Sequence, residues 1–236
     1  MVRSAGLPVV FLHGLGAMSS IDFAGLDAAL GGRRAWLVDM PGAGSPYDGA
    51  DASIAGQARF VAGLLDADGV GQVVVFGHSM GGAVAVALAG FRPDLVAGLI
   101  LAESNLDPGG GTWSRRIASM TETEFTAHGC QELIGEQQVE CPSWAATLAM
   151  SSPTAVHRQA VSLVAGTKPS WRQVLYGLDC PRFYLFGERN LPDPDESELP
   201  RHGVRVRVVA GAGHNMAYDN PAGFADTLAG CLKYTP

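Results

Sequence analysis

The chain has 236 residues, of which 47% are hydrophobic, and its formal net charge at pH 7 is -7. Such a chain can bury a large core, and globular α/β chains of this length often form one domain. No run of lysine or arginine offers an electrostatic footprint for phosphate backbones, so nucleic acid is a poor candidate partner. No stretch approaches the ~18 uncharged apolar residues of a membrane-spanning helix.

The start of the chain lacks the pattern of a secretory leader. Residues 1–8 carry one positive charge, and the apolar run that follows ends in His13-Gly14 instead of a small-residue cleavage site. We therefore expect a soluble, cytoplasmic protein without a membrane partner, either a monomer or a homodimer.

The four cysteines lie far apart and form no C-x-x-C pair, which gives little support to a zinc or redox site: Cys130, Cys141, Cys180 and Cys231. We expect free, mostly buried thiols. A bridge between Cys130 and Cys141 is the alternative in an oxidising compartment.

Short apolar runs alternate with longer alanine-rich stretches of helical spacing. We expect strands at residues 9–12, 35–38, 73–76, 99–101, 183–186 and 204–209. Helices are expected at 53–65, whose apolar residues share one face, and at 84–91, which Pro93 ends. This alternation predicts an α/β fold with a mostly parallel central sheet and helices on both faces.

The alternation stops between residues 107 and 177, where tryptophans and methionines are scattered among polar residues. We interpret residues 107–177 as a helical cap inserted into a core formed by residues 1–106 and 178–236. Most of its apolar residues are expected to pack the insertion onto the core.

A few apolar side chains are candidates for lining a ligand pocket. Trp113 and Trp144 lie in the insertion, and Met216 lies in the last third of the core. We expect these three side chains to contact the substrate.

The sharpest signal is Gly77-His78-Ser79-Met80-Gly81-Gly82, which directly follows one predicted strand and precedes an alanine-rich helix. This is the context of a nucleophile elbow. A serine there has strained backbone geometry, and glycines are needed two residues either side because a side chain would collide with the neighbouring elements. The helix N-terminus favours the negative charge that develops during acyl transfer. The pattern predicts Ser79 as the nucleophile.

A second glycine turn, His13-Gly14-Leu15-Gly16, ends the first predicted strand. It is either an ordinary strand-to-loop turn or part of a hydrolase site. In the latter interpretation the Leu15 and Met80 N–H groups form an oxyanion hole, where losing one donor costs ~10²- to 10³-fold in rate. His13 is expected to be structural.

The third signal is His214, which alone among six histidines lies in a glycine-flanked loop at the carboxyl end of a late strand. Enzymes built on such sheets place their ligands at this edge. A surface-loop histidine is the alternative. As a base, His214 would have to reach the Ser79 hydroxyl within hydrogen-bond distance.

These motifs, with D-M-P-G-A-G from Asp39, occur in the order of the α/β-hydrolase fold superfamily, which the sequence resembles across nearly its whole length. The chain starts almost directly at the strand before H-G-L-G. It is therefore similar to a trimmed member that lacks the first two strands of the full fold.

The third member of a triad departs from the common family pattern. Many members carry an aspartate in a G-x-x-D motif, where this chain has Gly187-Glu188-Arg189-Asn190. Asparagine cannot supply the negative charge that stabilises the imidazolium. The family also uses an acid one strand earlier, which here corresponds to Glu103. Asp193 is the second choice and Glu188 the third, and all three keep the order serine, acid, histidine.

The resemblance implies a serine hydrolase, similar to carboxylesterases and thioesterases, that acts on a small-molecule acyl substrate through an acyl-enzyme. No metal or organic cofactor is implied. The same triad also occurs in lyases and in biosynthetic acyl transferases or cyclases, which the fold does not separate. A non-catalytic ligand-binding protein is the third hypothesis, although the intact Ser79 and His214 motifs count against it.

Overall fold

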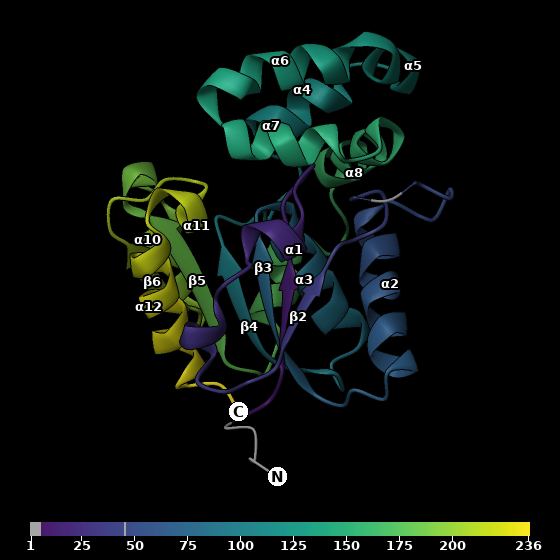
Figure 1. The fold of residues 1–236 in the computed structure, drawn as a ribbon. Helices are drawn as coiled ribbons and strands as arrows, with labels where there is room; N and C mark the ends of the chain where they lie inside the picture. The colour runs from purple at the N-terminus through teal and green to yellow at the C-terminus, as the bar shows by residue number, and fades with distance from the viewer. Residues whose placement is uncertain (1–5, 45) are drawn as a thin grey trace.

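The computed structural model describes residues 6–44 and 46–236, and in them six parallel strands form one sheet in the order β2-β1-β3-β4-β5-β6 (Figure 1). The strands are β1 (Val9–Leu12), β2 (Ala35–Val38), β3 (Val73–His78), β4 (Val96–Ala102), β5 (Arg182–Gly187) and β6 (Arg205–Val209). All the neighbouring pairs are parallel. The predicted α/β fold and the six predicted strands are confirmed.

Helices separate the strands along the chain. They are α1 (Ser19–Asp22), α2 (Ile54–Ala67), α3 (Met80–Phe91), α4 (Thr112–Ala118), α5 (Glu122–Glu124), α6 (Cys130–Glu140), α7 (Pro142–Ala149), α8 (Pro153–Ala165), α9 (Trp171–Tyr176), α10 (Asp195–Arg201), α11 (Met216–Asp219) and α12 (Pro221–Leu232). Three short turns of helix are η1 (Asp27–Leu30), η2 (Phe125–Gly129) and η3 (Glu188–Asn190).

Both faces of the sheet are covered, because successive side chains of a strand point to opposite faces. On β1, Val10 and Leu12 belong to the core shared with α2 and α3, whereas Val9 and Phe11 belong to the core shared with α12. All four are fully buried. A continuous apolar run is therefore what a central parallel strand requires.

The first turns of α2 and α3 follow from local sequence. Ser53 precedes α2, and its hydroxyl accepts a hydrogen bond from the Gly56 N–H at 3.0 Å, which satisfies a free donor of the first turn. Helix α3 begins at Met80, four residues before the predicted start at Val84. The sequence did not predict this earlier start, because Gly81 lies in the first turn and glycine disfavours helices.

Helices α4 to α8 lie together above the sheet, as one group apart from the helices that flank it (Figure 1). Helix α9 returns to the sheet domain, where Val174 approaches Gly90 of α3. The division into a core and a cap at residues 107–177 therefore stays a prediction, since its last helix packs on the core.

Cys130, Cys141, Cys180 and Cys231 are all free thiols, and Cys130 and Cys231 are buried. Burial raises the pKa of the Cys231 thiol to about 11, so it remains protonated at neutral pH. No bridge joins Cys130 to Cys141.

Across residues 6–44 and 46–236, the helices are all too short or too polar to cross a lipid bilayer.

Candidate active site

Ser79 occupies the sharp turn between β3 and α3. Its backbone angles are φ 53° and ψ -119°, in a region that residues with a side chain rarely adopt. The Ser79 N–H donates to the Ala102 carbonyl of β4 at 2.8 Å, which holds the turn against the neighbouring strand. The turn places Ser79 at the N-terminus of α3 and on the wall of a cavity.

The glycines on either side of Ser79 are required by close backbone contacts. A methyl group built on Gly77 would lie 2.5 Å from the Gly81 carbonyl oxygen, and one on Gly81 would lie 2.2 Å from the Leu12 carbonyl oxygen. These are backbone atoms of the elbow and of β1, so neither can move aside as a flexible side chain can.

Replacing Gly81 with alanine is therefore expected to lower the free energy of unfolding by about 1–3 kcal/mol, the usual cost of overpacking. Gly63, in the middle of α2, is exposed, and a methyl group added there would meet no other atom within 4 Å. Gly63→Ala is expected to raise stability by about 0.5–1 kcal/mol, because alanine favours helices. Urea denaturation of the two variants measures both effects, and equal stability of the Gly81 variant and wild type would contradict the packing argument.

The turn after β1 lies directly against the elbow. A methyl group built on Gly14 would lie 3.4 Å from the Ser79 Cβ and 3.3 Å from the His78 Nδ1. In the part of the chain that the structure describes, the N–H groups of Leu15 and Met80 donate to no protein acceptor. Two free amides thus flank Ser79, which is what an anion-binding site beside it requires.

Glu103 ends β4 and lies beside His214. Its Oε2 is 3.8 Å from His214 Nδ1, which is within ion-pair reach and longer than a hydrogen bond. Its Oε1 accepts the Gly187 N–H at 2.7 Å, and the side chain of Asn190 is close enough to lower the pKa of the carboxyl. Like Ser79, Glu103 has a positive φ, 46°, so the chain turns sharply at both strand ends.

The electrostatic setting of Glu103 keeps it ionised. Burial alone would raise its pKa, but the interactions with His214, the Gly187 N–H and Asn190 outweigh burial, so the pKa lies below its usual value. The carboxylate is therefore charged at neutral pH, and only 12% of its side chain is exposed.

His78 contacts His214 from the other side, although the sequence analysis assigned it no role. The His78 Nε2–H donates to the His214 backbone carbonyl at 2.8 Å, and the two rings lie 4.9 Å apart. Burial is the main cause that lowers the pKa of His78 to about 3, and the proximity of His214 adds to it. His78 is therefore neutral and holds the loop of His214 in place. Its position beside Ser79 in the elbow motif was the available sequence signal.

The other two acid candidates are engaged elsewhere. The Asp193 carboxylate accepts the Asp195 N–H at 2.7 Å, at the start of α10. The Glu188 carboxylate accepts the Gly211 N–H at 2.7 Å. Of the three candidates, the structure places Glu103 next to His214.

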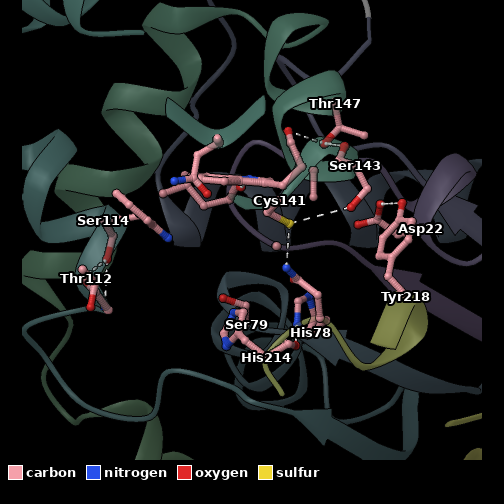
Figure 2. Close-up of a pocket in the computed structure, with 18 of the residues that line it drawn as sticks. Asp22, His78, Ser79, Thr112, Ser114, Cys141, Ser143, Thr147, His214 and Tyr218 are labelled. Carbon is pink, nitrogen blue, oxygen red and sulfur yellow. Dashed lines mark hydrogen bonds between the residues drawn. The ribbon is translucent and has the colours of Figure 1, made fainter. Parts of the chain in front are cut away.

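A cavity of about 440 Å³ lies between the elbow and helices α4, α6 and α7. Ser79, His78 and His214 line one side of it, and Cys141, Ser143 and Thr147 of the helical segment line the opposite side (Figure 2). The Asn215 amide donates to the Cys141 sulfur at 3.1 Å, which links the histidine loop to the helices above it. The volume is that of a small-molecule site.

Two of the three expected substrate contacts line this cavity. The rings of Trp113 and Trp144 lie 5.7 Å apart, and the Trp144 indole N–H donates to the Leu15 carbonyl at 2.7 Å. Met216 does not line it and is 2% exposed, because it packs in the core cluster that contains Phe224. An apolar residue close to His214 in the sequence can pack in the core or line the cavity, and the sequence did not show which of the two holds for Met216.

The model of the Alpha/beta hydrolase family matches residues 9–227. The chain belongs to the alpha/beta hydrolase family. Among its curated relatives, the mouse sn-1-specific diacylglycerol lipase ABHD11 is 29% identical over 97% of this chain and 82% of its own. A 2-succinyl-6-hydroxy-2,4-cyclohexadiene-1-carboxylate synthase from Salmonella agona is 27% identical over 99% of this chain and 97% of its own.

Solved structures of this hydrolase family share the fold. A thermophilic esterase from Thermogutta terrifontis is 25% identical, with a TM-score of 0.78 over 97% of this chain and 90% of its own. An esterase from Exiguobacterium antarcticum is 21% identical, with a TM-score of 0.80 over 98% of this chain and 93% of its own. The chain is therefore an enzyme of the α/β-hydrolase type with esterases among its structural neighbours.

Proposed function

We propose that the protein is a serine hydrolase that cleaves a carboxylic ester, thioester or related acyl substrate through a triad of Ser79, His214 and Glu103. The observation that carries this proposal is the placement of Ser79, at a strained turn on the wall of a small-molecule cavity that His214 also lines. Glu103, charged and 3.8 Å from His214, supports the role of third member.

The mechanism follows from these positions. His214 takes the proton of the Ser79 hydroxyl as its oxygen attacks the acyl carbon, and the tetrahedral intermediate places its negative oxygen between the Leu15 and Met80 amides. His214 then donates the proton to the leaving group, which departs. Water repeats the cycle on the acyl-enzyme and releases the acid, so no oxidant or cofactor is needed.

Glu103 would act on His214 from the Nδ1 side. A carboxylate there keeps the proton on Nδ1, so that Nε2 is free to accept the serine proton, and it stabilises the imidazolium that forms. The hydrogen bond from the Gly187 N–H holds the carboxylate in its place, and the nearby Asn190 side chain helps to keep it ionised. Asn190 thus supports the acid from the G-x-x-D position without being the acid.

The segment 107–177 is proposed as the cap that closes the substrate site. Its helices supply Trp113 and Trp144, whose rings offer an apolar wall for an acyl chain, while most other cap residues at the cavity are hydroxyls and amides. A cavity of about 440 Å³ admits a small or medium acyl group.

A cyclase or lyase that uses the same triad is the second candidate. The observation that favours it is the 27% identity to the Salmonella agona synthase over 99% of this chain. An acyl transferase would need a cavity that excludes water from the acyl-enzyme. Rapid Ser79-dependent hydrolysis of a simple ester would favour the hydrolase over these alternatives.

The proposal can be tested without knowing the substrate, by intact-mass measurement after treatment with a fluorophosphonate. We expect one adduct in wild type and none in Ser79→Ala, because only an activated serine attacks the probe at a useful rate. Ser119→Ala is the matched control, since Ser119 is exposed on the cap, outside the cavity, and it should retain the adduct. A folded wild-type protein that forms no adduct would contradict the proposed function.

A further inference from the structure

The charges that line the cavity are of one sign. Among the described residues that line it, Asp22 carries a carboxylate and none is a lysine or an arginine. The remaining polar lining residues are mostly neutral amides and hydroxyls, including Asn105, Gln137 and Ser143. The carboxylate of Glu103 lies just behind His214 and adds a second negative charge near the reacting atoms.

Asp22 is held in place at the end of α1. The Tyr218 hydroxyl donates to its Oδ1 at 2.7 Å, and Tyr218 also lines the cavity (Figure 2). Within the described part of the chain, no basic side chain forms an ion pair with Asp22. The carboxylate of the neighbouring Asp39 accepts from the Ser20 N–H and hydroxyl, and its charge is close enough to raise the pKa of Asp22.

Asp22 is charged under ordinary assay conditions. Burial is the main cause that raises its pKa to about 6, the Tyr218 hydrogen bond opposes this rise, and Asp39 adds to it. At pH 8 the group is therefore ionised. An anionic substrate that entered the cavity would lose its hydration, meet this carboxylate and find no side-chain cation to replace the lost water.

We propose that the cavity selects substrates without a negative charge, and that Asp22 is the specificity-determining residue that excludes esters bearing a carboxylate. This inference rests on the proposed hydrolase function and names the substrate class of the same site. An uncharged acyl group meets neutral hydrogen-bonding side chains and the two tryptophan rings, none of which requires a charge on the substrate.

The test compares two activated esters that share one acyl chain and differ at its far end, which is a neutral methyl ester in methyl 4-nitrophenyl adipate and a carboxylate in mono-4-nitrophenyl adipate. At pH 8 and low salt, we expect kcat/KM of wild type to be at least about tenfold higher for the neutral methyl ester, because like charges within one partly buried cavity repel more strongly than they do in water. Asp22→Asn removes the charge and keeps an acceptor for the Tyr218 hydroxyl. It should bring the two kcat/KM values closer by at least about threefold, because only the charge-dependent repulsion is lost.

Asp68→Asn is the matched control, since Asp68 is an exposed carboxylate at the C-terminus of α2, away from the cavity. It makes the same change in net charge and should leave the ratio of the two values unchanged. Equal kcat/KM for the two esters in wild type, or an unchanged ratio in Asp22→Asn, would overturn this inference alone. Failure of both esters to show Ser79-dependent hydrolysis would overturn the proposed function, and this inference with it.

Discussion

Replacing Ser79 with alanine is expected to lower kcat/KM for a neutral activated ester by about 10⁵- to 10⁶-fold, as in other serine triads. The variant lacks the oxygen that forms the acyl-enzyme, so His214 and Glu103 have no nucleophile to activate. The two free amides of Leu15 and Met80 remain, and their stabilisation of the oxyanion leaves a small residual rate above the uncatalysed one. Initial rates of 4-nitrophenol release measure the loss.

The control for this prediction is Ser119→Ala, which should retain the rate of wild type because the Ser119 hydroxyl is exposed and donates to the Arg116 carbonyl, away from the cavity. Thermal unfolding should show that the Ser79 variant remains folded. Alanine at this position still has a strained backbone, so no large gain in stability is expected. A Ser79 variant that hydrolyses the ester within tenfold of wild type would assign the activity to another group, in contrast to the expected ~10⁵-fold loss.

The sheet was predictable because its signal is local. The run at 9–12 coincides with β1, since a strand covered on both faces needs continuous apolar sequence, and the run at 35–38 coincides with the partly buried edge strand β2. The elbow was predictable for the same reason, because strand, serine and helix are contiguous in the chain. The start of α3 could not be predicted in this way. Glycine at position 81 is required by the close approach of the Leu12 carbonyl, although glycine disfavours helix formation.

Contacts between distant parts of the chain were beyond the sequence patterns. The bond from His78 to the His214 carbonyl joins the ends of β3 and β6, which are not neighbours in the sheet. The pair of Asp22 and Tyr218 likewise joins α1 to α11. The sequence around these residues does not reveal their partners, because the order of the strands and the paths of the loops determine which side chains meet. For the same reason the prediction for Met216 was wrong: no sequence pattern shows that its side chain packs into the core and not into the cavity.

The position of the triad acid could be predicted in part from the sequence. The strand order β3-β4-β5 places the carboxyl end of β4 beside that of the nucleophile strand, so an acid at the end of β4 can face the histidine loop. The family resemblance supplied this position as an alternative to G-x-x-D. What it did not supply is the proximity of Asn190 to Glu103, by which the side chain at the common acid position helps to keep the replacement ionised.

Replacing Glu103 with glutamine is expected to lower kcat by about 10³- to 10⁴-fold, close to the effect of removing the acid of other triads. Glutamine has nearly the same shape, but its amide carries no charge to stabilise the imidazolium of His214. Asp193→Asn and Glu188→Gln should retain most of the activity, because these carboxylates accept backbone N–H groups away from the cavity. The three variants are compared by kcat on the neutral ester, and a larger loss in Asp193→Asn would assign the acid to the loop after β5.

The double variant Glu103→Gln, Asn190→Asp separates loss of charge from loss of structure. Because the Asn190 side chain lies near the Glu103 carboxylate and lines the same cavity as His214, a carboxylate at 190 restores a negative charge within reach of the same region. We expect it to recover at least about tenfold of the kcat lost in Glu103→Gln, since the triad depends on charge beside the imidazole more than on which strand supplies it. Recovery without any change in thermal stability would show that the missing charge limited turnover. A double variant as slow as Glu103→Gln would show that the geometry at the end of β4 is itself required.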